Sequence, residues 1–174
     1  MSFQRPISHR LTLTDGQTLR LTPGPTYPRW LGFDSWQEGR ATILTLALAT
    51  PSAIRLEPGQ EVAVDPGIVF HLPIGVRLDF RPAPSPPERP HDGLVLFRPP
   101  PKRMPRPVPG VTIPVRASLH LWHSAGASGP PQQTPNGCRL VNRRHLRPIV
   151  ILPGDPIAQA VFYPPRQTNP EPET

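Results

Sequence analysis

The chain has 174 residues, including 30 prolines, and a formal net charge of +7 at pH 7. This length suits one domain with a sizeable core, and so many prolines exclude a mainly helical protein, because proline lacks an amide proton and breaks helix interiors. The lone cysteine, Cys138, excludes an intrachain disulfide and a cysteine-based zinc site, and no apolar run approaches the roughly 20 residues of a membrane span.

The first half of the chain reads as a series of short strands. Residues 7–22 alternate apolar and polar side chains on both sides of Asp15-Gly16, which favours a tight turn, so we predict a β-hairpin. The leucine-rich stretch 41–50 predicts a strand that is buried on both faces. Residues 52–82 repeat a short alternating strand followed by a Pro-Gly or Pro-Ile-Gly turn. This pattern is typical of a sandwich or barrel.

A Pro/Arg-rich insertion over 82–109 interrupts the strands. Adjacent prolines favour an extended polyproline conformation without ladder donors, so we expect a mostly mobile projecting loop with one short strand at 94–97. After a predicted strand pair over 110–124, composition indicates a flexible loop over 125–137.

Residues 138–165 then predict two or three strands around a Pro-Gly-Asp turn. We therefore expect a single all-β domain over 1–165 and a polar tail over 166–174. The start of the chain has no apolar segment typical of a secretory signal, so we expect a cytoplasmic or nuclear location.

The start of the insertion has the pattern of a ligand for an SH3-type partner protein. Arg81, Pro84 and Pro87 fit an Arg-x-x-Pro-x-x-Pro ligand, and Pro84, Pro87 and Arg89 fit the opposite orientation. A solvent-exposed spacer is the alternative interpretation of the same residues.

The positive charge predicts at most weak, non-specific binding of polyanions, because the arginines lack an aromatic platform for stacking bases. A solvated, arginine-rich surface explains the charge equally well. A second basic group, Arg139, Arg143, Arg144, His145 and Arg147, precedes the last strands. It suits either phosphate contact or an edge that discourages aggregation. His120, His123 and His145 lack the spacing of a metal site, so we predict no bound metal.

Two blocks of the sequence resemble the dUTPase and dCTP deaminase superfamily. Residues 54–75, IRLEPGQEVAVDPGIVFHLPIG, are similar to the family's strand, Pro-Gly turn, strand, Gly-Ile, strand, Leu-Pro-Glu-Gly pattern. Residues 149–162, IVILPGDPIAQAVF, match the family's Pro-Gly-Asp-Arg-Ile-Ala-Gln-Leu-Val-Phe block. The tripeptide 32–34, Gly-Phe-Asp, more weakly resembles the opening Gly-Tyr-Asp-Leu motif. The resemblance implies a distorted jelly-roll barrel that usually forms a homotrimer, with nucleotide sites between neighbouring chains.

The resemblance implies that Asp34, Arg81, Ser85, Asp155 and Gln159 occupy the positions of a nucleotide site. Asp34 would help to hold Mg²⁺ with phosphates in an active enzyme. Each residue also has a structural interpretation, with Asp155 making a turn and Gln159 satisfying backbone groups.

The motifs that carry the family's chemistry are missing. No Asp or Glu occurs between Asp92 and Asp155, where the family places the carboxylate that activates water. The glycine-rich C-terminal arm is also missing, so we predict no catalytic residues and no cofactor. We expect a catalytically inactive dUTPase-like protein that binds a partner protein, similar to viral members of the family. The alternatives are a divergent dUTP pyrophosphatase or dCTP deaminase, which would use Mg²⁺, and a basic nucleic-acid-binding module.

Overall fold

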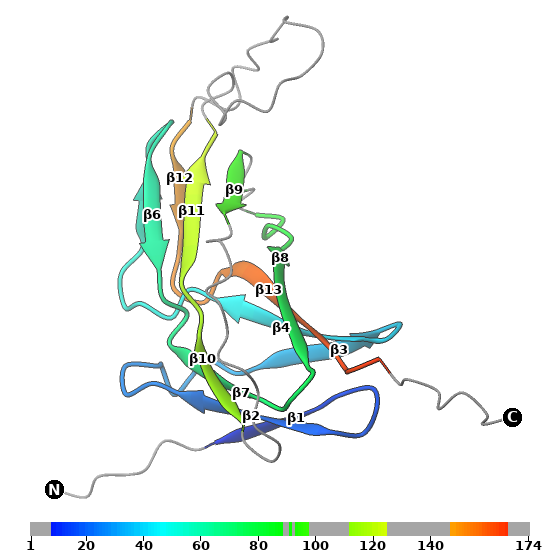
Figure 1. Cartoon of the computed structure of the whole chain (residues 1–174). Coiled ribbons are helices and arrows are strands. Elements are labelled where there is room, and N and C mark those ends of the chain that lie inside the picture. The colour runs from blue at the N-terminus through cyan, green and yellow to red at the C-terminus, as the bar shows by residue number, and fades with distance from the viewer. Residues whose placement is uncertain (1–7, 89–90, 92, 98–111, 125–146, 167–174) are drawn as a thin grey trace, which may run out of the picture.

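The computed structural model describes residues 8–88, 91, 93–97, 112–124 and 147–166. These residues form thirteen strands and no helix, arranged as four antiparallel sheets (Figure 1). The predicted all-β class is therefore confirmed, and the arrangement is consistent with a distorted jelly roll. Within the described part of the chain, no helix is long and apolar enough to span a membrane.

The first sheet begins with the predicted hairpin. Gly16 adopts a φ of 87°, which glycine reaches without steric cost, and the side chain of Asp15 accepts a hydrogen bond from the Gln17 amide. Its strands, in spatial order, are β1 (His9–Thr12), β2 (Thr18–Pro23), β7 (Ile68–Leu72) and β10 (Ile113–Arg116).

The second four-stranded sheet contains the strand that was expected to be buried on both faces. Residues 41–44 are all buried, because one face of this sheet packs on the main core and the other carries a small apolar cluster of Ala41, Ile43 and Val161. Its strands, in spatial order, are β3 (Asp34–Glu38), β4 (Ala41–Ala47), β13 (Pro156–Tyr163) and β8 (Arg77–Pro82).

Two smaller sheets complete the fold, and their labelled strands β6, β11 and β12 lie at one end of the molecule in Figure 1. One sheet has the order β6 (Glu61–Val64), β11 (Leu119–His123) and β9 (Leu94–Phe97). The other pairs β5 (Ile54–Leu56) with β12 (Ile149–Ile151), in the register Ile54 to Ile151 and Leu56 to Ile149. The two blocks that carry the family resemblance thus meet as neighbouring antiparallel strands.

One continuous apolar core joins the sheets. Phe70 of β7 and Phe162 of β13 are fully buried and meet edge to face, with ring centroids 5.4 Å apart. Each fully buried leucine or phenylalanine contributes about 1.5–3 kcal/mol relative to an exposed one. The alternation of β11 supplies Leu119, Leu121 and His123 to the buried face, as its sequence pattern predicts.

His91 and the strand at 94–97 of the insertion do not project freely from the domain. The predicted strand at 94–97 is present as β9, which pairs with β11, and His91 is buried with 6% of its surface exposed. The expectation of a projecting loop is wrong for these residues, because the apolar side of β9 and the His91 ring pack on the domain. The predicted loop at 125–137, together with Cys138, lies outside the described residues, and so do Arg89 and His145.

Candidate functional site

Three of the five predicted nucleotide-binding residues lie in one cross-strand row of the second sheet. Asp34 of β3 is opposite Thr45 of β4, which is opposite Gln159 of β13, which is opposite Arg81 of β8. Directly paired residues of antiparallel strands point to the same face. The sequence-predicted Asp34, Gln159 and Arg81 therefore share the sheet face that is turned away from the main core.

Other protein groups occupy the polar atoms of this row. The Nε of Arg81 donates a hydrogen bond to Oε1 of Gln159 over 2.5 Å. The two terminal nitrogens of Arg81 donate to the two carboxylate oxygens of Glu38, at 3.3 and 2.8 Å. Gln159 is buried, with 6% of its surface exposed, so water is largely excluded from its side chain. The hydrogen bond from Arg81 takes the place of water at the side-chain oxygen. The guanidinium is thus bound on two sides by this chain.

Glu38 is the residue of this face that the sequence did not single out. The hydrogen bonds and charge of Arg81 lower the pKa of the Glu38 carboxyl, and the same contacts raise the pKa of Arg81. A carboxylate with a lowered pKa is a weak general base. The sequence hints at the role of Glu38 only through an acidic residue directly before Gly39, and this pattern also suits an ordinary turn.

The other two predicted residues, Ser85 and Asp155, lie together beside His91. The His91 amide donates to Oγ of Ser85 at 3.0 Å, and His91 Nε2 lies 3.6 Å from Oδ2 of Asp155, within ion-pair range but longer than a hydrogen bond. Asp155 Oδ2 also accepts a hydrogen bond from the Leu152 amide at 2.9 Å, which closes the turn before β13. The structural interpretation of Asp155 as a turn residue is therefore supported.

The residues of the predicted SH3-type ligand differ in their availability. Pro84 and Pro87 are exposed beyond the end of β8. Arg81 lies within β8, opposite Gln159, and its guanidinium contacts Glu38. The orientation that begins with Arg81 would require this residue to leave the sheet and its ion pair, whereas the opposite orientation would not.

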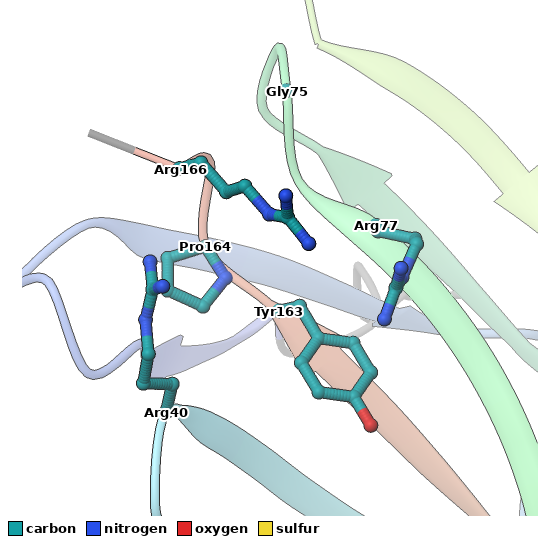
Figure 2. A pocket seen from close by; sticks show the side chains of 6 residues that line it. All are labelled: Arg40, Gly75, Arg77, Tyr163, Pro164 and Arg166. Atoms are coloured by element: carbon teal, nitrogen blue, oxygen red, sulfur yellow. The ribbon is translucent and has the colours of Figure 1, made fainter. Parts of the chain in front are cut away.

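An open pocket of about 430 Å³ lies at the far end of the same sheet face (Figure 2). It is lined by Arg40, Arg77, Arg166, Tyr163, Pro164 and Gly75. The Arg77 guanidinium stacks on the Tyr163 ring, 4.4 Å from its centroid. Sequence reasoning missed this pocket because its three arginines come from separate segments.

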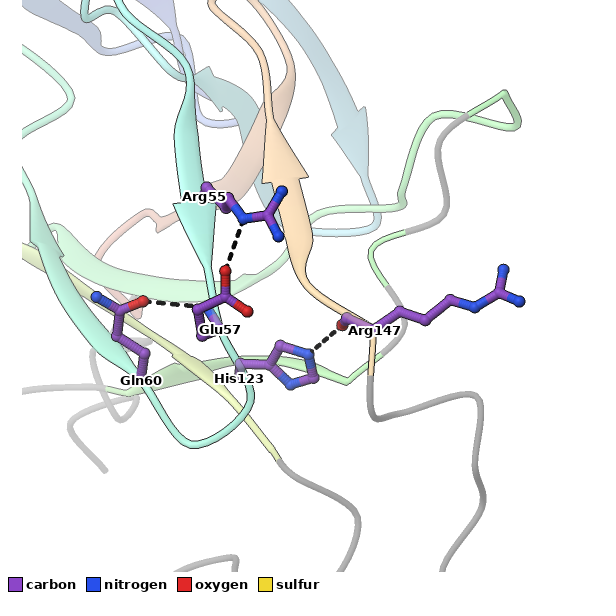
Figure 3. Close-up of polar contacts among 5 residues, drawn as sticks. All are labelled: Arg55, Glu57, Gln60, His123 and Arg147. Carbon is purple, nitrogen blue, oxygen red and sulfur yellow. Dashed lines mark hydrogen bonds and ion pairs between the residues drawn. The ribbon is translucent and has the colours of Figure 1, made fainter.

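The described histidines of the trio point to opposite faces of β11. His120 lies 2.9 Å from a carboxylate oxygen of Glu61. His123 is buried, and its Nε2 lies 2.6 Å from the carbonyl oxygen of Arg147 (Figure 3). A carbonyl oxygen can only accept, so Nε2 of His123 carries the proton. Among the residues that the structure describes, no three His, Cys, Asp or Glu side chains gather as a metal site would need.

The Mg²⁺ that active relatives would use fits this face poorly. Mg²⁺ in nucleotide sites is held by one or two carboxylates together with substrate phosphates. Asp34 supplies one exposed carboxylate, but the neighbouring Arg81 and Gln159, which would orient phosphates, bind each other instead.

Comparison with known proteins finds a likeness in structure and none in sequence. No protein-family model matches it, and no curated protein matches it in sequence. Among solved structures, it is similar to the dUTPase of Staphylococcus bacteriophage 80alpha, one of the phage dUTPases reported to control transfer of virulence genes by a proto-oncogenic G protein-like mechanism. The two share 14% sequence identity with a TM-score of 0.49, over 90% of this chain and 97% of the phage protein. The confirmed all-β fold thus has a dUTPase among its structural neighbours.

Proposed function

We propose that this chain is a dUTPase-like domain that does not hydrolyse nucleotides and acts by binding a partner protein. The kinship rests on the two sequence blocks, whose strands β5 and β12 pair with each other while β13 lies between β4 and β8. By the same resemblance we propose a homotrimer that acts in the manner of viral members of the family. We also propose that it acts in the cytoplasm or nucleus.

The observation that carries the proposal is the engagement of Arg81. An arginine that binds phosphate must offer its planar fork to the ligand, but this fork is bound to Glu38 and its Nε to Gln159. A nucleotide would have to displace both partners. In addition, the sequence has no acidic residue between Asp92 and Asp155 to activate a water molecule.

We assign partner binding to the exposed prolines Pro84 and Pro87, followed by Arg89. Ser85, which lies between them, accepts a hydrogen bond from the His91 amide, and residues 87–88 form a turn, so docking in an extended conformation would replace this hydrogen bond. An extended, proline-restricted segment loses little entropy when it docks in an aromatic groove. SH3-type domains, which present such grooves, are the partner class.

Purified protein tests the loss of hydrolysis. We expect no pyrophosphate release from dUTP and no ammonia release from dCTP, with or without Mg²⁺. Steady turnover that Asp34→Ala abolishes would overturn the proposal in favour of a divergent enzyme, because Asp34 shares a row with Gln159 and Arg81.

A panel of purified SH3 domains tests partner binding. We expect at least one domain to bind, with the affinity falling tenfold or more in the double variant Pro84→Ala/Pro87→Ala. The matched control, Pro25→Ala/Pro51→Ala, changes two other exposed prolines and should bind as the wild type does. Light scattering and thermal unfolding of both variants show whether stability or assembly changed. Absence of binding across the panel, or equal loss in the control, would contradict the proposal.

The direction of the ligand is tested separately. Arg89→Gln should weaken binding, whereas Arg81→Gln should not, because Arg81 belongs to β8 and its ion pair. The reverse result would assign the other orientation.

A further inference from the structure

We propose that the pocket formed by Arg40, Arg77 and Arg166 binds a small phosphate compound that carries several negative charges. This inference goes beyond the proposed function and does not depend on it. The pocket lies at the opposite end of the sheet face from the paired residues Arg81 and Gln159. Its own pair, Arg77 and Tyr163, is four residues away from that pair on each strand.

Three cationic side chains from three different segments line the pocket. Arg40 belongs to the turn between β3 and β4, Arg77 begins β8, and Arg166 follows the end of β13. Figure 2 shows the Arg166 and Arg77 side chains reaching into the space above Tyr163, with Arg40 on the other side of Pro164. A guanidinium offers a planar fork of donors that matches the geometry of phosphate oxygens.

The backbone around each arginine is held in place. A Cβ built on Gly75, which has a φ of 79°, would lie 2.9 Å from the Pro165 side chain, so only glycine admits this close approach of the segment that carries Arg166. The Arg40 carbonyl accepts a hydrogen bond from Thr14 Oγ1 at 2.8 Å. Arg77 is oriented by its contact with the Tyr163 ring.

The charge of the pocket is unbalanced within the described residues. None of its lining residues is acidic. Glu38, at the start of the same turn as Arg40, is bound to Arg81 instead. Asp79, the acid nearest to Arg77 along β8, is not among the lining residues. Like charges held together repel one another, and an anion in the pocket would relieve that repulsion.

The size of the pocket selects the class of ligand. A volume of about 430 Å³ is far larger than one phosphate group and lies in the usual range for small-molecule sites. The Arg77 and Arg166 guanidinium groups, with Arg40 lining the pocket beyond Pro164, suit several charges on one compact molecule, such as a chain of two or three phosphates. The shared chemistry is the polyphosphate group, whether free or carried by a nucleotide.

Titration calorimetry with inorganic tripolyphosphate tests the proposal on the full chain. We expect measurable binding by the wild type and at least tenfold weaker binding by Arg77→Gln/Arg166→Gln. The control, Arg10→Gln/Arg29→Gln, removes the same charge from exposed positions elsewhere and should change affinity less than twofold. dUTP and a short single-stranded oligonucleotide serve as further ligands.

Equal affinity for tripolyphosphate and dUTP would support recognition of the phosphates alone. Absence of tripolyphosphate binding, equal weakening by both double variants, or binding of the oligonucleotide only would overturn the proposal. Gly75→Ala provides a second test, because it pushes Pro165 away and should weaken tripolyphosphate binding with all three arginines present.

Discussion

Arg81 of β8 and Glu38 of β3 form an ion pair that joins the two edge strands of one four-stranded sheet. Strands β4 and β13 lie between these edges, so the paired side chains cross over the face that carries Ile43 and Val161. The pair therefore holds the arginine of the predicted nucleotide site and also covers a small apolar cluster.

The ion pair should make the free energy of unfolding depend on pH in the acid range. Because Arg81 lowers the folded-state pKa of Glu38 below its ordinary 4.5, the unfolded chain takes up the proton first as pH falls. The stabilising contribution is thus present above about pH 4.5 and is lost as pH falls through the lower folded pKa. Denaturant unfolding between pH 7 and pH 3 should show a weaker acid dependence in Glu38→Gln than in wild type. Asp34→Asn, which removes a carboxylate from the same strand and face, is the control for loss of negative charge alone.

His71 should produce a second pH dependence at higher pH. Burial and the charge of Arg20 lower the pKa of His71 below 6.5, and its ring lies 3.0 Å from Thr22 Oγ1. The unfolded chain therefore binds the proton more readily, so the free energy of unfolding falls as pH decreases below about 6.5. Unfolding titrations at pH 7.5 and 5.5 should show this fall in wild type and a smaller one in His71→Gln. The same fall in both proteins would exclude His71 as its cause.

Much of the fold followed from local patterns in the sequence. Asp15-Gly16 requires a positive φ at the glycine, and the alternation of 119–123 places every second side chain on the core, as the structure confirms. The pairing of β5 with β12 is a long-range contact that no local pattern in either segment indicates.

The interactions of the candidate site could not be predicted in the same way. Arg81 and Glu38 are 43 residues apart, and nothing in either segment indicates that the other lies opposite. His91 sits within a proline-rich stretch that reads as exposed, yet Asp155 and the domain surface bury it. Such contacts depend on how the sheets curve and pack, and residue patterns along one strand do not encode that.

The buried His123 should stabilise the domain by joining β11 to the chain just before β12. Replacing it with leucine removes the hydrogen bond to the Arg147 carbonyl, and a typical hydrogen bond contributes about 0.5–1.5 kcal/mol to stability. His123→Gln keeps a nitrogen donor at a similar reach and should restore part of the loss. Denaturant unfolding of the two variants checks this order, and a leucine variant as stable as wild type would contradict it.

Alanine should destabilise the domain more at Gly154 than at Gly16, because Gly154 contacts the Trp30 ring although both glycines have the same φ. Gly154 and Gly16 both have a φ of 87°, so alanine at either position costs about 1–2 kcal/mol through backbone strain. At Gly154 the new Cβ would also lie 3.0 Å from the Trp30 ring, whereas at Gly16 it meets nothing within 4 Å. Gly154→Ala should therefore lower the free energy of unfolding more than Gly16→Ala and shift the tryptophan fluorescence. Adding Trp30→Ala to each variant separates backbone strain from the ring contact. Without the ring, the two glycine substitutions should lower the free energy of unfolding equally. A difference that persists would show that the turn at Gly154, and not the contact with Trp30, causes the larger loss.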